Sequence, residues 1–122
     1  MLNQQVHSYR DLVVWQKAMD LVIAVYRLTE IFPVNEQYGL TAQIKRAAIS
    51  IPSNIAEGRR RGTRKDYRQF LIIAYGSGAE LETQSEIAKR LRFINDDDYN
   101  RISALASEVM KMLNTMIARL SE

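Results

Sequence analysis

The sequence predicts an all-α protein, an antiparallel up-down four-helix bundle that forms a single domain over residues 1–122. Apolar residues recur at intervals of three and four positions through long segments, which is the spacing of one face of an α-helix. Only two prolines and five glycines interrupt these segments. With 47% hydrophobic and 25% charged residues, the chain has the composition of one soluble domain with its own core.

The first helix is expected over residues 9–32. Ser8 can cap its amino end, and Asp11, three residues later, completes a capping box. Trp15 is predicted to lie in the core or at a subunit interface. The residues expected on the inner face are Leu12, Trp15, Ala18, Met19, Val22, Val25, Tyr26 and Thr29.

A second helix is expected after Pro33, since a proline disfavours helical backbone in the residue before it. Asn35 is its expected cap, and the helix is expected to extend to about residue 57. Pro52 removes one backbone donor inside this helix, so we expect a bend there. Gly58 is expected to end the helix in the left-handed conformation. The expected inner face consists of Leu40, Ile44, Ala47, Ala48, Ile51 and Ile55.

The third and fourth helices are expected over residues 64–93 and 96–120. Thr63 and Asp66 form a capping pair for the third, and the aspartates at 96–98 suit the positive end of the fourth helix dipole. The third inner face is expected to hold Tyr67, Phe70, Leu71, Ala74, Tyr75, Gly78, Leu81, Ser85, Ala88 and Leu91. The fourth is expected to hold Ile102, Leu105, Val109, Met112, Leu113, Met116, Ile117 and Leu120.

The lengths of these segments predict the topology. Helices of about 21 to 30 residues are about 30 to 45 Å long, at about 1.5 Å per residue. The connections between them are short, and short connections place successive helices antiparallel.

Rare and missing residue types exclude several classes of site. The chain has no cysteine, which excludes disulfides, thiolate nucleophiles and thiolate metal sites. Its one histidine, His7, precedes every arginine and does not fit the spacing of di-iron bundles or Arg–His ribonucleases. No apolar run is long enough to cross a bilayer, and the polar residues 3–5 do not resemble a secretory signal. We therefore expect a cytoplasmic, non-enzymatic protein without metal or cofactor.

Positive charge is concentrated between the second and third helices. Six of the ten residues from 59 to 68 are basic and one, Asp66, is acidic, a local excess of five in a chain of net charge +3. This density favours a polyanionic partner, because cations that neutralise phosphates release counterions. A solvated helix corner is the alternative interpretation. The predicted nucleic-acid-binding residues are Arg59, Arg60, Arg61, Arg64, Lys65 and Arg68, with Lys45 and Arg46 of the second helix as an extension.

Polar residues on the second and third helices indicate contacts between these two helices. Glu80 and Gln84 are expected to hydrogen-bond to Ser50, Ser53 or Asn54. Such bonds would fix the register of the bundle.

Other charged and aromatic residues of the third helix have two interpretations each. Tyr67 lies among the arginines and can stack on a base, but its helical spacing favours the core. Glu80, Glu82 and Glu86 can be considered for general-acid or metal chemistry, but Glu82 and Glu86 share a helix face with Arg90. That spacing favours a surface charge ladder.

Several of these segments resemble the 23S rRNA intervening-sequence proteins, also called the S23 ribosomal protein family. The matching residues are Leu12 to Trp15 with Gln16 and Ala18, Tyr38-Gly39-Leu40 with Gln43, Arg46 and Ala47, Ile51 to Gly58, Gly76-Ser77, and Glu80 to Gln84. The resemblance covers almost the whole chain. It implies a four-helix bundle that assembles as a homo-oligomer, a pentamer, and reading frames found within insertions in large-subunit ribosomal RNA genes.

Together, the charge cluster and the resemblance lead to one main hypothesis, an oligomeric bundle that binds RNA, with ribosomal RNA or its precursor as the ligand. A protein–protein interaction scaffold is the competing class. The architecture is also similar to the accessory bundles of diversity-generating retroelements, which assist a reverse transcriptase on nucleic acid, but that likeness is at the level of the fold. A metal-dependent hydrolase using Glu80 and Glu82 is a third alternative.

Overall fold

The computed structural model describes residues 8–121, which fold into four α-helices and two short 3-10 helices. The expectations for His7 and for the polar start of the chain fall outside this range. The elements are η1 (Tyr9–Asp11), α1 (Val13–Thr29), η2 (Val34–Glu36), α2 (Leu40–Arg60), α3 (Arg64–Arg90) and α4 (Asp96–Leu120). Over residues 8–121, the predicted all-α class is confirmed.

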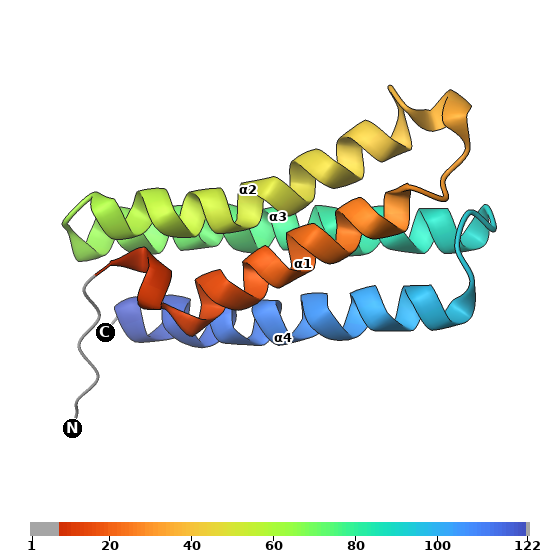
Figure 1. Ribbon diagram of the computed structural model, residues 1–122. Coiled ribbons are helices and arrows are strands. Elements are labelled where there is room, and N and C mark those ends of the chain that lie inside the picture. Colours follow the sequence, from red (N-terminus) through yellow and green to blue (C-terminus); the bar gives the residue numbers. More distant parts are fainter. Residues whose placement is uncertain (1–7, 122) are drawn as a thin grey trace.

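The four α-helices form an antiparallel bundle in which each helix packs against two neighbours (Figure 1). Among the described residues, α1 and α3 each contact α2 and α4, whereas the two diagonal pairs have no Cα atoms within 8 Å of each other. Figure 1 shows η1, the α2–α3 turn and the last turn of α4 together at one end, which we call the arginine end. The α1–α2 and α3–α4 connections lie at the opposite end.

The core is built from the apolar faces that the residue spacing predicts. Each of the four α-helices contributes side chains that are almost completely buried. Removing such a side chain costs about 2 to 5 kcal/mol, so these faces hold the bundle together. The largest of them are Leu21, Val25, Ile44, Ile51, Ile55, Leu71, Leu81, Val109 and Leu113.

Three residues predicted on inner faces are exposed instead. Tyr26 is 40% exposed and Tyr75 is 37% exposed, because each lies at the margin of its buried stripe. Leu91 is 56% exposed, because α3 ends at Arg90 and Leu91 lies just beyond the helix.

The start of the chain contains a short turn where a continuous helix was predicted. Ser8 caps η1, with Asp11 completing the predicted capping box. Leu12 then adopts extended backbone, with φ −74° and ψ 125°, so α1 begins only at Val13. Ser8 and Asp11 therefore cap the 3-10 turn rather than the long helix.

The cap of α2 differs from the prediction. Asn35 lies inside η2 and does not cap the helix, which begins five residues later at Leu40. The Glu36 carboxylate takes this role instead, because its Oε1 accepts a hydrogen bond of 3.1 Å from the backbone N–H of Leu40. Pro52 lies buried within α2, and Figure 1 shows the first half of α2 diverging from α3, as the predicted bend requires.

Gly58 does not end α2, contrary to the prediction. It is buried within the helix, which continues to Arg60, and the left-handed residue of the turn is Gly62, with φ 90°. A Cβ atom on Gly58 would lie 2.6 Å from the Cβ of Phe70. The absence of a side chain at Gly58 therefore allows α2 and α3 to approach closely beside the turn.

Of the remaining helix ends, the start of α3 has the predicted cap, whereas the cap of α4 was not predicted. The Thr63 hydroxyl accepts a hydrogen bond of 3.1 Å from the Asp66 N–H at the start of α3. At the end of α3, Arg92 has a left-handed φ of 63°. Asn95 caps α4 by accepting from the N–H of Asp98 at 2.8 Å, and the predicted acidic residues 96–98 form the first turn.

Candidate nucleic-acid interface

The predicted basic residues lie where α2 ends and α3 begins. We call the six side chains of Arg59, Arg60, Arg61, Arg64, Lys65 and Arg68 the basic corner. Five of them are exposed, and Arg68 is partly buried against α4. The turn at Gly62 reverses the chain, so cations from two helices meet at the arginine end of the bundle.

Two members of the basic corner hold the carboxyl end of α4. Nη2 of Arg64 donates to the carbonyl oxygen of Arg119 at 3.0 Å, and Nε of Arg68 donates to that of Ile117 at 3.2 Å. The last carbonyls of a helix have no partner within the helix, and cations are favoured there by the helix dipole. A carbonyl is uncharged, so these bonds position both guanidinium groups without neutralising them.

The other arginines of the corner lie over aromatic rings. The guanidinium carbon of Arg61 is 4.9 Å from the centre of the Phe70 ring, and that of Arg59 is 5.9 Å from the Tyr67 ring. Cations at these distances are attracted to the ring face. Arg61 also forms an ion pair with Glu57 at 3.0 Å, so its charge is partly offset.

Tyr67 packs against the core, as its spacing predicts. Burial raises the pKa of its hydroxyl above the ordinary value of 10.0, and the charge of Arg59 acts weakly in the opposite direction. The hydroxyl is buried and has no hydrogen-bond partner within residues 8–121. Its position favours a core role over stacking on a base.

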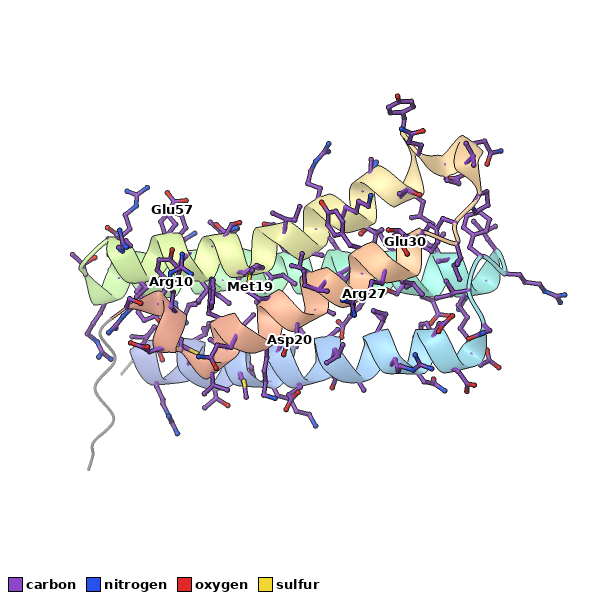
Figure 2. All side chains as sticks on the ribbon, in the orientation of Figure 1. Arg10, Met19, Asp20, Arg27, Glu30 and Glu57 are labelled. Atoms are coloured by element: carbon purple, nitrogen blue, oxygen red, sulfur yellow. The ribbon has the colours of Figure 1, made fainter. Side chains whose placement is uncertain are left out.

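The segment before α1 extends the basic corner in a way that the sequence did not predict. The guanidinium carbon of Arg10 lies 5.6 Å from the ring centres of both Tyr9 and Trp15. Arg60 approaches the same Tyr9 ring to 5.4 Å. Arg10 is thus linked through Tyr9 to the basic corner, 50 positions away along the chain. Figure 2 shows Arg10 and Glu57 at the same end of the bundle.

Lys45 and Arg46 do not join the basic corner. They precede Arg59 by about 13 residues on the same helix, which corresponds to about 20 Å. The Lys45 ammonium lies 4.6 Å from the centre of the Tyr26 ring, on the α1 side. Arg46 lines a hollow of about 200 Å³ between α2 and α3. Their predicted role as an extension of the corner is therefore wrong in position.

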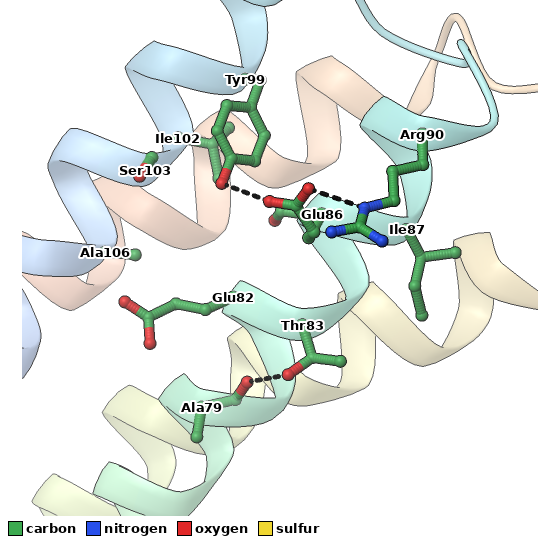
Figure 3. Close-up of a pocket in the computed structure, with 11 residues that line it drawn as sticks. Ala79, Glu82, Thr83, Glu86, Ile87, Arg90, Tyr99, Ile102, Ser103 and Ala106 are labelled. Atoms are coloured by element: carbon green, nitrogen blue, oxygen red, sulfur yellow. Dashed lines mark hydrogen bonds and ion pairs between the residues drawn. The ribbon is translucent and has the colours of Figure 1, made fainter.

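Glu86 organises a separate groove of about 670 Å³ between α3 and α4 (Figure 3). Its carboxylate accepts from Arg90 at 3.0 Å and from the Tyr99 hydroxyl at 2.9 Å. The bond from Arg90 is the largest cause of a lowered Glu86 pKa, and the bond from Tyr99 adds to it. The same bond raises the pKa of Tyr99. The predicted pairing of Glu86 with Arg90 is confirmed.

The carboxylates considered for metal chemistry do not converge. Glu82 lines the α3–α4 groove of Figure 3, whereas Glu80 lines the hollow between α2 and α3. The two side chains therefore lie on different sides of α3 and do not share a site. Within residues 8–121, no three His, Cys, Asp or Glu side chains are grouped so that they could hold a metal ion.

The fold and these motifs match one known family. The pattern of the 23S rRNA-intervening sequence proteins fits residues 10–115. The chain belongs to this family. A solved structure from Bacteroides thetaiotaomicron, described as a protein with unknown function from the S23 ribosomal protein family, is 30% identical. The similarity covers 86% of this chain and 98% of that chain, with a TM-score of 0.79. No protein with a curated description matches this chain.

In this member of the 23S rRNA-intervening sequence family, hydroxyl and amide side chains of α2 and α3 serve the contact between these helices. The hydroxyls of Ser50 and Ser77 are 2.8 Å apart, and Nδ2 of Asn54 donates to the carbonyl and hydroxyl of Ser50 at 2.8 and 2.9 Å. Ser77 thus makes the bond predicted for Glu80 or Gln84. Glu80 is exposed, and Oε1 of Gln84 is buried with no hydrogen-bond partner in the described part of the chain.

Each helix within residues 8–121 is too short or too polar to span a membrane.

Proposed function

We propose that this protein is a non-enzymatic, cytoplasmic RNA-binding protein that assembles as a homo-oligomer, a pentamer, and contacts ribosomal RNA or its precursor through the basic corner. The single observation that carries the proposal is the way the corner cations are held. Arg68 donates to a backbone carbonyl of α4, and Arg60 lies over the ring of Tyr9. These contacts orient the two cations without cancelling their charge.

This geometry suits a phosphate backbone. Arg64 and Arg68 are already fixed by α4, so less side-chain freedom is lost when the corner binds a ligand. Guanidinium groups match the oxygens of a phosphate in two-point hydrogen bonding. Affinity from such contacts depends on salt and carries little sequence information. We therefore expect binding that is strong at low salt and tolerant of RNA sequence.

Exposed apolar residues on α3 support self-assembly. Ile72, Ile73 and Ile87 are each about two-fifths exposed, and Gly76 between them has open space at the position of a Cβ atom. Small residues flanked by large apolar residues allow a neighbouring surface to approach closely. Symmetry would then repeat the basic corner on one particle, and several corners on one strand would raise the overall affinity.

Paired charge variants test the role of the corner. In one variant, Arg59, Arg60 and Lys65 are changed to glutamine, which spares the arginines that hold α4. In the matched control, Arg27, Lys45 and Arg46 are changed to glutamine, so the net charge falls by the same amount. We expect the corner variant to bind RNA at least about 10-fold more weakly than the control. Equal affinities of the two variants for the same RNA would refute the proposed role of the basic corner in RNA binding.

The mass of the native protein in solution tests the assembly. We expect a particle five times the chain mass of 14.1 kDa, measured by sedimentation equilibrium. A variant with Ile73 and Ile87 changed to glutamine should dissociate while keeping its helical content. A native particle with the mass of a single chain would contradict self-assembly and would leave the RNA test standing.

A protein–protein scaffold is the second candidate, favoured by an apolar patch at the opposite end. Val34, the first residue of η2, is 85% exposed, and Tyr38, shortly after η2, is 91% exposed. If this patch recruits a partner, changing both residues to serine should release a stoichiometric protein that survives nuclease treatment. RNA affinity should be unchanged in that variant, because the patch lies at the end away from the basic corner.

A further inference from the structure

A groove between α1 and α2 lies directly beside the basic corner. It encloses about 310 Å³ and is lined by Tyr9 and Trp15 at one end, with Met19, Ile49 and Pro52 along its walls. Figure 2 shows Met19 between α1 and α2. The volume is at the lower end of the range of about 300 to 1,000 Å³ for small-molecule pockets. The lining is mostly apolar and includes two aromatic rings at one end.

Arginines surround those rings. Arg60 and Arg10 both lie within 6 Å of the centre of the Tyr9 ring, and Arg10 is equally close to Trp15. Tyr9 and Trp15 meet edge to face, with ring centres 5.4 Å apart. The mouth of the groove therefore combines flat apolar surface with positive charge within a few ångströms.

We propose that this groove accepts an unpaired nucleobase, so that the RNA bound at the basic corner is single-stranded where it crosses α1 and α2. The inference rests on the proposed RNA-binding function and specifies its substrate class. The base stacks against Tyr9 or Trp15, and the flanking phosphates contact Arg10 and Arg60. Proteins that bind single strands combine these two features, aromatic platforms and a cationic track, because every base has a flat face.

A perfect duplex does not fit this arrangement. Its bases are stacked and paired, so moving one into the groove first costs the free energy of unstacking and unpairing. A base that is already unpaired avoids this cost. Duplex RNA can still contact the exposed arginines of the basic corner through its phosphates. A second copy of the chain is the competing occupant of an apolar groove. The arginines at its mouth favour the phosphate-bearing ligand, because cations at an apolar contact between copies would have to lose water.

Trp15 gives a direct signal, because it is the only tryptophan in the chain. We would titrate the native protein with a single-stranded RNA oligonucleotide that cannot pair with itself, and with the same sequence annealed into a blunt duplex. At equal ionic strength, the single strand should quench Trp15 fluorescence and bind about 5- to 150-fold more tightly than the duplex. The duplex should bind without quenching.

Two variants separate the groove from the corner. Ser53 is exposed on α2 and lines the groove, so Ser53→Gln places a longer side chain across it. The preference for single strands should fall by about 5-fold or more, with duplex affinity unchanged. Thr115→Gln, an exposed position on α4, is the matched control and should retain the preference. Tyr9→Leu keeps apolar bulk and should also lower the preference.

The outcomes are distinct. If neither RNA binds, the proposed function fails, and the groove inference fails with it. If both RNAs bind equally and Trp15 fluorescence does not change, the groove inference is overturned while the basic corner stands. If Trp15 fluorescence changes on dilution of the protein, and Ser53→Gln alters the assembled mass instead of RNA binding, the groove is a contact between copies and the inference is likewise overturned.

Discussion

The arginine end and the opposite end of the bundle both hold clusters of cations, but the cations bind different groups. At the arginine end, Arg64 and Arg68 donate to uncharged backbone carbonyls of α4. At the opposite end, Arg90 forms an ion pair with Glu86 at 3.0 Å, and Lys89 lies over the ring of Tyr99. The aspartates at 96–98 add negative charge to that end.

The difference shows that the partners of the cations, together with their number, set the local field. A carboxylate cancels the formal charge of an arginine, whereas a carbonyl or an aromatic ring orients it and leaves it positive. Glu57 offsets part of the charge on Arg61, and it is an exception at the arginine end. With its local excess of five positive charges over residues 59–68, the arginine end presents a positive surface, and the opposite end presents mixed charge.

The largest effect is expected where the arginine end is held together. Gly58→Ala places a Cβ atom 2.6 Å from that of Phe70, so α2 and α3 must separate. We expect a loss of about 1 to 3 kcal/mol in the free energy of unfolding, measured by urea denaturation. Asn114→Ala, at an exposed position on α4, is the control and should leave the free energy of unfolding unchanged or raise it by up to about 0.7 kcal/mol. Equal effects of the two substitutions would refute the close approach.

A smaller loss is expected when the bond between α3 and the end of α4 is removed. Arg68→Ala leaves the Ile117 carbonyl without its donor, which should cost about 1 to 2 kcal/mol. Amide hydrogen exchange should speed up in the last turn of α4 and not at its start. Lys65→Ala, which removes an exposed cation of the same corner, should leave that exchange unchanged.

At the opposite end, one substitution should stabilise the protein. Arg92 has a left-handed φ of 63°, a conformation that glycine adopts without cost. Arg92→Gly should therefore raise the free energy of unfolding by about 1 kcal/mol, measured by thermal and urea denaturation. A destabilised Arg92→Gly protein would mean that the arginine side chain makes a stabilising contact.

The smallest effect concerns pH and the ion pair of Glu86. The folded pKa of Glu86 lies below its ordinary value of 4.5, chiefly because Arg90 donates to the carboxylate. The charged form is therefore favoured in the folded state, and its contribution is present above pH 4.5 and is lost as pH falls through the folded pKa. Glu86→Gln should be slightly less stable than the native protein at pH 7 and equally stable well below pH 4. A stability difference that is independent of pH would contradict this pairing.

Much of the bundle follows from local sequence. The three- and four-residue spacing of apolar positions predicted the four helices and most of the core, and the caps at Ser8 and Thr63 follow from side chains within three residues. Glu36 replaced the predicted Asn35 because η2 lies between Pro33 and the start of α2 and moves that start to Leu40. Such short turns have no apolar periodicity from which to predict them.

The candidate site was predicted in composition but not in arrangement. The charge of residues 59–68 is visible in the sequence, but the bonds from Arg64 and Arg68 join groups 55 and 49 positions apart. Arg10 joins the corner only because η1 turns back onto α2 through Tyr9. Local patterns carry no signal for these long-range contacts. The separation of Lys45 and Arg46 from the corner, by contrast, follows from the helix rise per residue alone.

The salt dependence of RNA binding tests the central claim most directly. The logarithm of the association constant, plotted against the logarithm of salt concentration, has a slope of about −0.7 to −0.9 per neutralised phosphate. Changing Arg59, Arg60 and Lys65 to glutamine should flatten that slope by about 2 to 3, because three phosphate contacts are lost. The equally charged variant at Arg27, Lys45 and Arg46 should keep the native slope. Identical slopes for the native protein and the corner variant would contradict the account.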